Sequence, residues 1–234
     1  MINDIDFIIP IYNEEKRANK VENWLDWMSK NTIDCSLTLS LNGCNDNTEK
    51  ELKKFSHNNK IKILIDNEKG RGVAVINAVN KSKKKYLAIG SIDDAWDKNF
   101  YINAFKELNQ DESLFCVYGP KDHVDSIQNR VVIRKIISFF SKIFLRIVFF
   151  NKINQDTQCI KLFRQNIKFN RNLRKYNYFF DTYFFLLNKD LKLKFKNISI
   201  SVEDNNKNSK VNFSSMLEFV FDALIYIIKK PKIF

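Results

Sequence analysis

The stretch KKKYLAIGSIDDAWD, residues 83–97, decides the fold. An apolar run with strand character, Tyr86 to Ile89, leads directly into an acidic turn that contains Asp93 and Asp94. Open α/β sheets bind ligands at the carboxyl ends of their strands, so a central strand that ends in carboxylates predicts a site there. Carboxylates on such a loop can hold a hard divalent cation against the phosphates of a nucleotide. The alternative is a solvated acidic turn before the next helix, where Asp is common.

The sequence on both sides repeats a pattern of strand followed by helix. Strands that alternate with helices predict a mostly parallel sheet flanked by helices, which is a Rossmann-like α/β fold. Further strands are expected over residues 5–12, 35–41, 61–66, 114–118, in the segment after 156–159, and as one late strand over 192–203; helices are expected over 15–30, 73–79, 178–188 and 214–228.

The character of the chain changes after residue 126. Residues 127–150 predict one long helix or two, rich in Phe and Ile but interrupted by basic residues. Such a helix suits an interfacial position on anionic lipid. It equally suits a buried helix whose long cationic side chains extend out of the core. The helix over 214–228 is also amphipathic and closes on Lys229 and Lys230.

Composition and charge limit the classes of partner. The 234 residues are 44% hydrophobic and 28% charged, which is an ordinary globular balance in which one α/β domain can bury a core. The net charge of +12 indicates an anionic partner, either nucleic acid, an acidic membrane surface or a phosphorylated substrate. Because the basic residues are spread through helices rather than grouped on an aromatic-lined platform, we do not expect nucleic-acid binding.

Cysteine and histidine usage argues against a metal centre built from those residues. The four cysteines are scattered and form no Cys-x-x-Cys pair, and only two histidines are present. We therefore expect reduced thiols in a cytoplasmic protein. No run of about 18 uncharged apolar residues is present, and the acidic start of the chain predicts no signal peptide. The cysteines are Cys35, Cys44, Cys116 and Cys159, and the histidines are His57 and His123.

Six segments of the sequence, taken in order, carry a resemblance to a known family. They are FIIPIYNEE (7–15), LNGCNDNT (41–48), NEKGRGVAVINA (67–78), SIDDAW (91–96), DTQCIKLFR (156–164) and FFDTYFF (179–185). Together they resemble the family 2 glycosyltransferases of GT-A fold, and among these most closely the dolichyl- or polyprenyl-phosphate sugar synthases. The resemblance covers almost the whole chain.

The resemblance implies an inverting enzyme that moves a sugar from a UDP- or GDP-sugar to a polyprenyl or dolichyl phosphate. It would act as a peripheral protein on the inner face of a membrane. A family member that acts on a saccharide hydroxyl is the alternative. We expect a single catalytic domain over 1–234, in which 1–125 bind the nucleotide sugar and 126–234 bind the acceptor.

The expected site has a donor part and an acceptor part. Mg²⁺ or Mn²⁺ would neutralise the leaving diphosphate, with Asp93 as the ligand and Asp94 beside it. For a hydroxyl acceptor, Asp156 would be the general base, with Asp181 behind it. By resemblance, the nucleotide sugar would be bound by Pro10, Tyr12, Asn13, Glu14, Asn42, Asp46, Lys69, Gly70 and Arg71, and the acceptor by Lys121, Arg130, Arg134, Ser138 and Gln158.

Three positions depart from the family pattern. Ser91 stands where the metal loop usually has its first Asp, Leu41 where an acidic residue meets the nucleotide, and Ile160 where a Gly lies beside the acceptor. A neutral hydroxyl at position 91 should weaken cation binding. These departures also allow a hypothesis of another class, a non-catalytic member that binds a membrane or a partner enzyme.

Overall fold

The computed structural model describes residues 1–93, 95–130, 132–150, 152–153, 155–169, 179–204 and 213–229. Its centre is a seven-stranded sheet in the order β10-β7-β9-β6-β2-β4-β5. Neighbouring strands are parallel except at β9, which is antiparallel to both β6 and β7. The expected mostly parallel α/β sheet is confirmed. In this order the strands are Lys194–Asn197, Leu114–Gly119, Ile160–Arg164, Tyr86–Ile89, Ile5–Ile11, Ser36–Asn42 and Ile61–Asp66.

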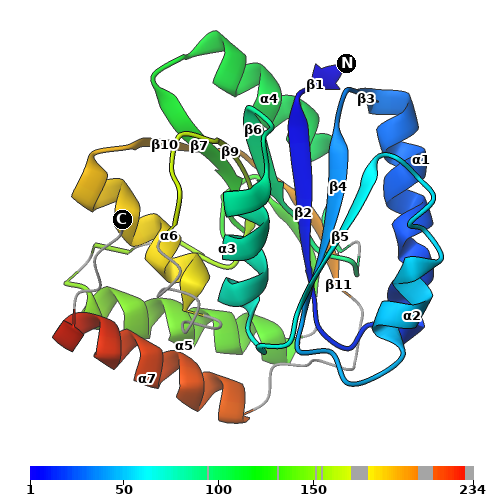
Figure 1. Ribbon diagram of the computed structural model, residues 1–234. Coiled ribbons are helices and arrows are strands. Elements are labelled where there is room, and N and C mark those ends of the chain that lie inside the picture. Colours follow the sequence, from blue (N-terminus) through cyan, green and yellow to red (C-terminus); the bar gives the residue numbers. More distant parts are fainter. Residues whose placement is uncertain are drawn as a thin grey trace.

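Helices cover both faces of this sheet (Figure 1). Along β2, Phe7 and Ile9 belong to the core beneath α1 (Val21–Asn31) and α4 (Asn99–Gln110). Ile8 between them belongs to the opposite core, beneath α3 (Arg71–Lys81) and α6 (Phe180–Leu191). Side chains of a strand alternate between faces, so a strand covered on both sides is mostly apolar, and in β2 the exception, Asp6, accepts a hydrogen bond from Thr38 Oγ1 at 2.7 Å. The short helices η1 (Glu15–Lys20) and α2 (Thr48–Lys53) follow β2 and β4, and β1 (Ile2–Asn3) pairs with β3 (Thr32–Ile33).

Two longer helices, α5 (Val132–Val148) and α7 (Phe213–Lys229), lie side by side beyond the carboxyl end of β2 (Figure 1). Ring contacts join them: Phe144 lies 6.3 Å from Phe219, and Phe149 lies 5.9 Å from Tyr226, between ring centroids. No helix within the described ranges combines the length and the apolar character that a membrane crossing requires.

Two expectations from the sequence are wrong in detail. Ile127–Arg130 does not begin the long helix but forms β8, which pairs in parallel with β11 (Ser201–Asp204). The expected late strand over 192–203 is therefore two strands, because β10 joins the main sheet and β11 joins β8. The amide of Ile127 donates to the carbonyl of Ile200 at 2.9 Å. Pairing between segments so distant in the chain leaves no trace in local periodicity, which explains both errors.

Candidate functional site

The acidic turn after β6 carries Asp93, the predicted metal ligand. The carbonyl oxygen of Asp93 accepts a hydrogen bond from Lys20 Nζ at 2.6 Å. Its side-chain Oδ1 is buried and has no hydrogen-bond partner within the described residues. Leaving a buried acceptor unsatisfied costs free energy, so this oxygen favours a ligand that supplies positive charge. Asp94, the other predicted carboxylate, lies outside the described residues.

The donor set of this turn fits a hard cation shared with a substrate. Among the described side chains, no three His, Cys, Asp or Glu residues converge on a common point. Mg²⁺ commonly uses only one or two carboxylates together with substrate phosphates and water. One unsatisfied oxygen of Asp93, with the hydroxyl of Ser91 two residues earlier, matches that incomplete arrangement of oxygen ligands.

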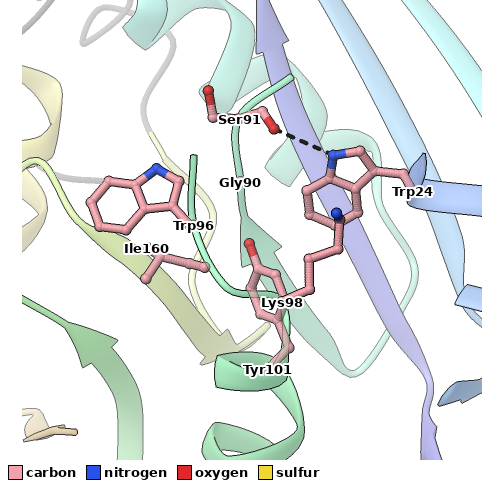
Figure 2. Close-up of a pocket in the computed structure, with 7 residues that line it drawn as sticks. All are labelled: Trp24, Gly90, Ser91, Trp96, Lys98, Tyr101 and Ile160. Carbon is pink, nitrogen blue, oxygen red and sulfur yellow. Dashed lines mark hydrogen bonds between the residues drawn. The ribbon is translucent and has the colours of Figure 1, made fainter. Parts of the chain in front are cut away.

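Behind the turn lies a narrow crevice between aromatic rings, too tight to hold a ligand (Figure 2). Here Trp24 Nε1 donates to the carbonyl of Ser91 at 3.3 Å. A Cβ on Gly90 would lie 2.9 Å from both the Trp24 ring and Ile9, so a larger residue does not fit. The turn is thus packed tightly on α1. The crevice is lined by Trp24, Gly90, Ser91, Trp96, Lys98, Tyr101 and Ile160.

The predicted nucleotide-binding residues meet where β2 and β4 end. Asn13 and Asn45 exchange hydrogen bonds: Asn13 Nδ2 donates to Asn45 Oδ1 at 2.5 Å, and the Asn45 amide donates to Asn13 Oδ1 at 2.9 Å. The amide of Glu14 donates to Thr48 Oγ1 at 2.6 Å. Asn13 has φ 51°, a left-handed conformation that Asn tolerates better than most residues. These bonds join the loop after β2 to the loop after β4.

Asp46 strengthens the same junction. Its carboxylate accepts from the amide of Thr48 at 3.0 Å and from the amide of Glu15 at 3.4 Å. Burial alone would raise the pKa of Asp46, but the hydrogen bonds from Thr48 and Glu15 lower it below its ordinary value. Asp46 is therefore ionised at neutral pH, and it is engaged in holding loop backbone.

A third loop, before α3, packs against the first two. The buried amide of Asn42 donates to the carbonyl of Ile11 at 2.8 Å and accepts from the amide of Gly70 at 3.1 Å. Lys69 Nζ lies 4.8 Å from the centre of the Tyr12 ring, within cation–π range. Asn42, Tyr12, Lys69 and Gly70 were predicted to bind one ligand, and the structure brings them together. Pro10, at the end of β2, is half-buried beside them.

Beneath this loop is a buried ion network that joins three elements. Asp181 of α6 accepts from Arg71 Nε at 2.7 Å and from Lys161 Nζ at 2.6 Å. Burial alone would raise the pKa of Asp181, but the charges and hydrogen bonds of Arg71 and Lys161 lower it to about 2. The suggestion that Asp181 stands behind Asp156 as a base is wrong, because both of its oxygens are held by cations. Its position links α6 to the first residue of α3.

The predicted acceptor residues Lys121, Asp156 and Gln158 also come together. Lys121 Nζ lies 2.6 Å from Asp156 Oδ2 and donates to the carbonyl of Gln158 at 2.6 Å. The same ammonium lies 5.0 Å from the centre of the Trp96 ring, which follows the acidic turn after β6. Because β9 is antiparallel, the loop that precedes it reaches the same edge of the sheet as the turn after β6.

For the remaining acceptor candidates the structure gives only positions along the chain. Arg130 ends β8 and Arg134 lies in the first turn of α5, but their side chains are outside the described part of the structure. Ser138 lies one turn after Arg134 and is half-buried. The acceptor role of these three residues stays a prediction.

Three residues of the site were missed from the sequence. Lys161 carried a signal, because a lone lysine in an apolar strand must find a buried partner. Lys20 and Trp24 gave no signal in the sequence, because each bonds to a backbone oxygen more than sixty residues away. Lys20 Nζ lies 2.6 Å from the carbonyl of Asp93, and Trp24 Nε1 lies 3.3 Å from that of Ser91. Local patterns do not report contacts of that kind.

Known proteins resemble this chain in sequence and in fold. It is 24% identical over 238 residues to a dolichyl-phosphate beta-glucosyltransferase of Trichomonas vaginalis, covering 94% of this chain and 72% of that protein. A glucosyl-3-phosphoglycerate synthase of Mycobacterium tuberculosis, solved with Mn²⁺, UDP and glucosyl-3-phosphoglycerate, has a TM-score of 0.67 at 12% identity, over 97% of this chain and 81% of that one. The mannosyl-3-phosphoglycerate synthase of Rubrobacter xylanophilus has a TM-score of 0.67 at 9% identity, over 97% and 73%.

The sequence also matches the profile of glycosyl transferase family 2 over residues 6–190. This range contains the acidic turn, the three joined loops after β2, β4 and β5, and the buried ion network. The match spans most of the chain and confirms the resemblance inferred from the six segments. The chain therefore belongs to glycosyl transferase family 2.

Proposed function

We propose that this family 2 glycosyltransferase transfers a sugar from a UDP- or GDP-sugar to a polyprenyl or dolichyl phosphate, with inversion and with a divalent cation. The observation that carries the proposal is Asp93, whose buried Oδ1 has no hydrogen-bond partner within the described residues at the carboxyl edge of the sheet. The Mn²⁺ and UDP bound by the mycobacterial structure, and the name of the Trichomonas relative, support the same assignment.

On the donor side, the three joined loops would bind the nucleoside diphosphate. Lys69 and Arg71 would place positive charge near the phosphates, and Gly70 would let the backbone approach them. Mg²⁺ or Mn²⁺ held by Asp93, with Ser91 and Asp94 beside it, would supply further neutralisation of the leaving diphosphate. The 1–125 half of the single domain is proposed to bind the donor in this way.

On the acceptor side, the pairing of Asp156 favours a phosphate over a hydroxyl. A hydroxyl acceptor must lose a proton to a base. The candidate base, Asp156, has its Oδ2 only 2.6 Å from Lys121 Nζ, so an ammonium already stands beside the oxygen that would have to take the proton. A lipid phosphate is already an oxyanion: its oxygen forms the new bond to the anomeric carbon as the bond to the diphosphate breaks, and no proton needs to move. Cations such as Arg130, Arg134 and Lys121 would hold it in line.

Exposed apolar side chains on α5 and α7 support an encounter with a membrane. Phe139 and Phe140 of α5 are each 60% exposed, and Phe221 of α7 is 68% exposed. Exposed basic residues of α5, Lys135 and Arg146, lie on the same helix. Apolar side chains beside cations suit the boundary between acyl chains and anionic headgroups. We propose that this surface rests on the membrane from which the lipid phosphate protrudes, as a peripheral association.

The test is transfer of labelled glucose from UDP-glucose to a short polyprenyl phosphate, with and without Mn²⁺. Asp93→Ala should abolish metal-dependent turnover, because it removes the proposed ligand. The matched control is Asp97→Asn. Asp97 is an exposed carboxylate in the same loop and has no role in the proposal, so this variant should retain activity. Arg134→Ala should reduce transfer to the lipid while sparing slow hydrolysis of the donor.

Several results would contradict the proposal. Full activity of Asp93→Ala would remove the metal assignment. Efficient transfer to a saccharide hydroxyl that is lost in Asp156→Asn would favour the alternative acceptor. Wild-type protein that binds no nucleotide sugar in a thermal-shift screen, where a selective ligand raises the melting temperature by mass action, would favour a non-catalytic member.

A further inference from the structure

Three side-chain donors bind backbone carbonyls of the segment 89–93, which contains the proposed metal ligand Asp93. The carbonyl of Ile89, at the end of β6, accepts from the hydroxyl of Tyr101 at 3.1 Å. The carbonyl of Ser91 accepts from Trp24 Nε1 at 3.3 Å, and that of Asp93 accepts from Lys20 Nζ at 2.6 Å. The acceptors are the carbonyls of every second residue from the end of β6 into the turn. Figure 2 shows the first two donors beside the loop.

The donors stand on two rigid elements. Lys20 and Trp24 are four residues apart, so they lie on one face at the start of α1. Tyr101 is in the first turn of α4, and the buried Trp24 ring packs against it at 6.0 Å. Lys98, just before α4, places its ammonium 5.1 Å from the Trp24 ring. The loop is therefore hydrogen-bonded to side chains at the start of α1 and α4, and these two helices pack against each other.

We infer that Lys20 is a positioning residue that sets the cation affinity of Asp93, an inference that rests on the proposed metal site. With Ser91 in place of a carboxylate, the loop has less charge with which to attract a cation, and its affinity depends more on being ordered beforehand. The bond from Lys20 fixes the backbone of Asp93 while leaving Oδ1 without a hydrogen-bond partner. A site that is already ordered does not spend binding free energy on ordering.

The charge of Lys20 has an opposite effect on cation binding. Its ammonium is a positive charge beside the cation site, and Coulomb repulsion alone would make its removal strengthen cation binding. Lys20 is half-buried, in contact with solvent that screens this repulsion, whereas the hydrogen bond to Asp93 is short and direct. We therefore expect the ordering effect to win.

The experiment measures Mn²⁺ binding to the full chain in the presence of UDP, by the loss of the electron paramagnetic resonance signal of free Mn²⁺. Lys20→Met should weaken Mn²⁺ binding about tenfold, the factor for ordering roughly one residue at the moment of binding. Lys20→Arg, which can still donate, should restore most of the affinity. Lys16→Met, an exposed lysine of η1, controls for the loss of a charge and should leave the affinity unchanged.

A second measurement needs no metal. Amide hydrogen exchange over residues 89–93 of the cation-free protein should be faster in Lys20→Met than in wild type or Lys16→Met. The inference about Lys20 would be overturned if Lys20→Met bound Mn²⁺ as tightly as wild type or more tightly, and if its amide exchange were unchanged. The proposed metal site would survive that result provided that wild type binds Mn²⁺ and Asp93→Ala does not. Wild-type protein that binds no Mn²⁺ would instead refute the proposed metal site.

Discussion

Removing the carboxylate of Asp181 should be among the most damaging single changes in this protein. Lys161 is completely buried, and Asp181 is the anion at 2.6 Å that compensates its charge. Breaking a buried pair by removing one partner typically costs about 3–5 kcal/mol, because the other charge stays buried. Asp181→Asn preserves volume and so isolates the charge. We expect its free energy of unfolding to fall by about that amount, a large share of the roughly 5–15 kcal/mol of a typical domain.

The pH dependence of stability gives a second value for the contribution of Asp181 to the free energy of unfolding. The pKa of Asp181 falls from 3.8 to about 2 on folding, which corresponds to roughly 2–3 kcal/mol at about 1.4 kcal/mol per pKa unit. Because the folded pKa is the lower one, this stabilisation is present above the unfolded pKa near 4. It is lost as the pH falls from about 4 to about 2. The mutational cost is larger because mutation also leaves Lys161 without its counter-charge.

Urea unfolding followed by tryptophan fluorescence measures both effects. The matched comparison is Lys161→Met/Asp181→Leu, which removes the buried pair together. It should cost far less than Asp181→Asn, since replacing a whole buried pair by apolar residues is often neutral. Arg71, 28% exposed, can remain hydrated without Asp181. A loss below about 1 kcal/mol in Asp181→Asn, or a double variant that is no more stable than the single one, would refute this account.

Two further predictions concern the loops and the membrane surface. Gly43 has φ +62°, and a Cβ there would lie 2.9 Å from a neighbouring backbone nitrogen, so Gly43→Ala should destabilise the fold by about 1–3 kcal/mol. Gly43→Ala should also weaken UDP binding. Scanning calorimetry measures the loss of stability and titration calorimetry measures the loss of affinity. An unchanged melting temperature would show that the backbone at residue 43 is not strained by the added Cβ. Phe139→Asp/Phe140→Asp on α5 should reduce sedimentation with anionic vesicles at least tenfold, because each exposed ring would contribute about 1.5–3 kcal/mol when inserted. Wild-type binding should also fall as salt rises, and vesicle binding that responds to neither change would count against the membrane surface.

The sheet was readable from the sequence because its strands are locally defined. Ile61–Asp66 and Tyr86–Ile89 are confirmed at the residues expected, since each is a short apolar run between turn residues. The loops that follow β2, β4 and β5 were also identified, and the structure brings their predicted residues together.

What the sequence did not reveal depends on contacts across long separations. The split of residues 192–203 into β10 and β11 depends on pairing with strands far upstream. The bond of Lys20 to Asp93 and the pairing of Asp181 with Lys161 are of the same kind. Asp181 in particular reads as a polar residue on a helix, and only its packing against β9 makes it a buried counter-ion.

The reversed direction of β9 has a consequence for how this enzyme can change. A parallel strand contributes to the mouth of the sheet only through the loop that leaves it, whereas β9 contributes through Gln155–Cys159, the segment that enters it. The loops proposed to bind the donor follow other strands, so exchanging this entering segment for that of a homologue would leave their sequences unchanged. If this segment binds the acceptor, as proposed above, chimaeras made there should change which acceptor is used.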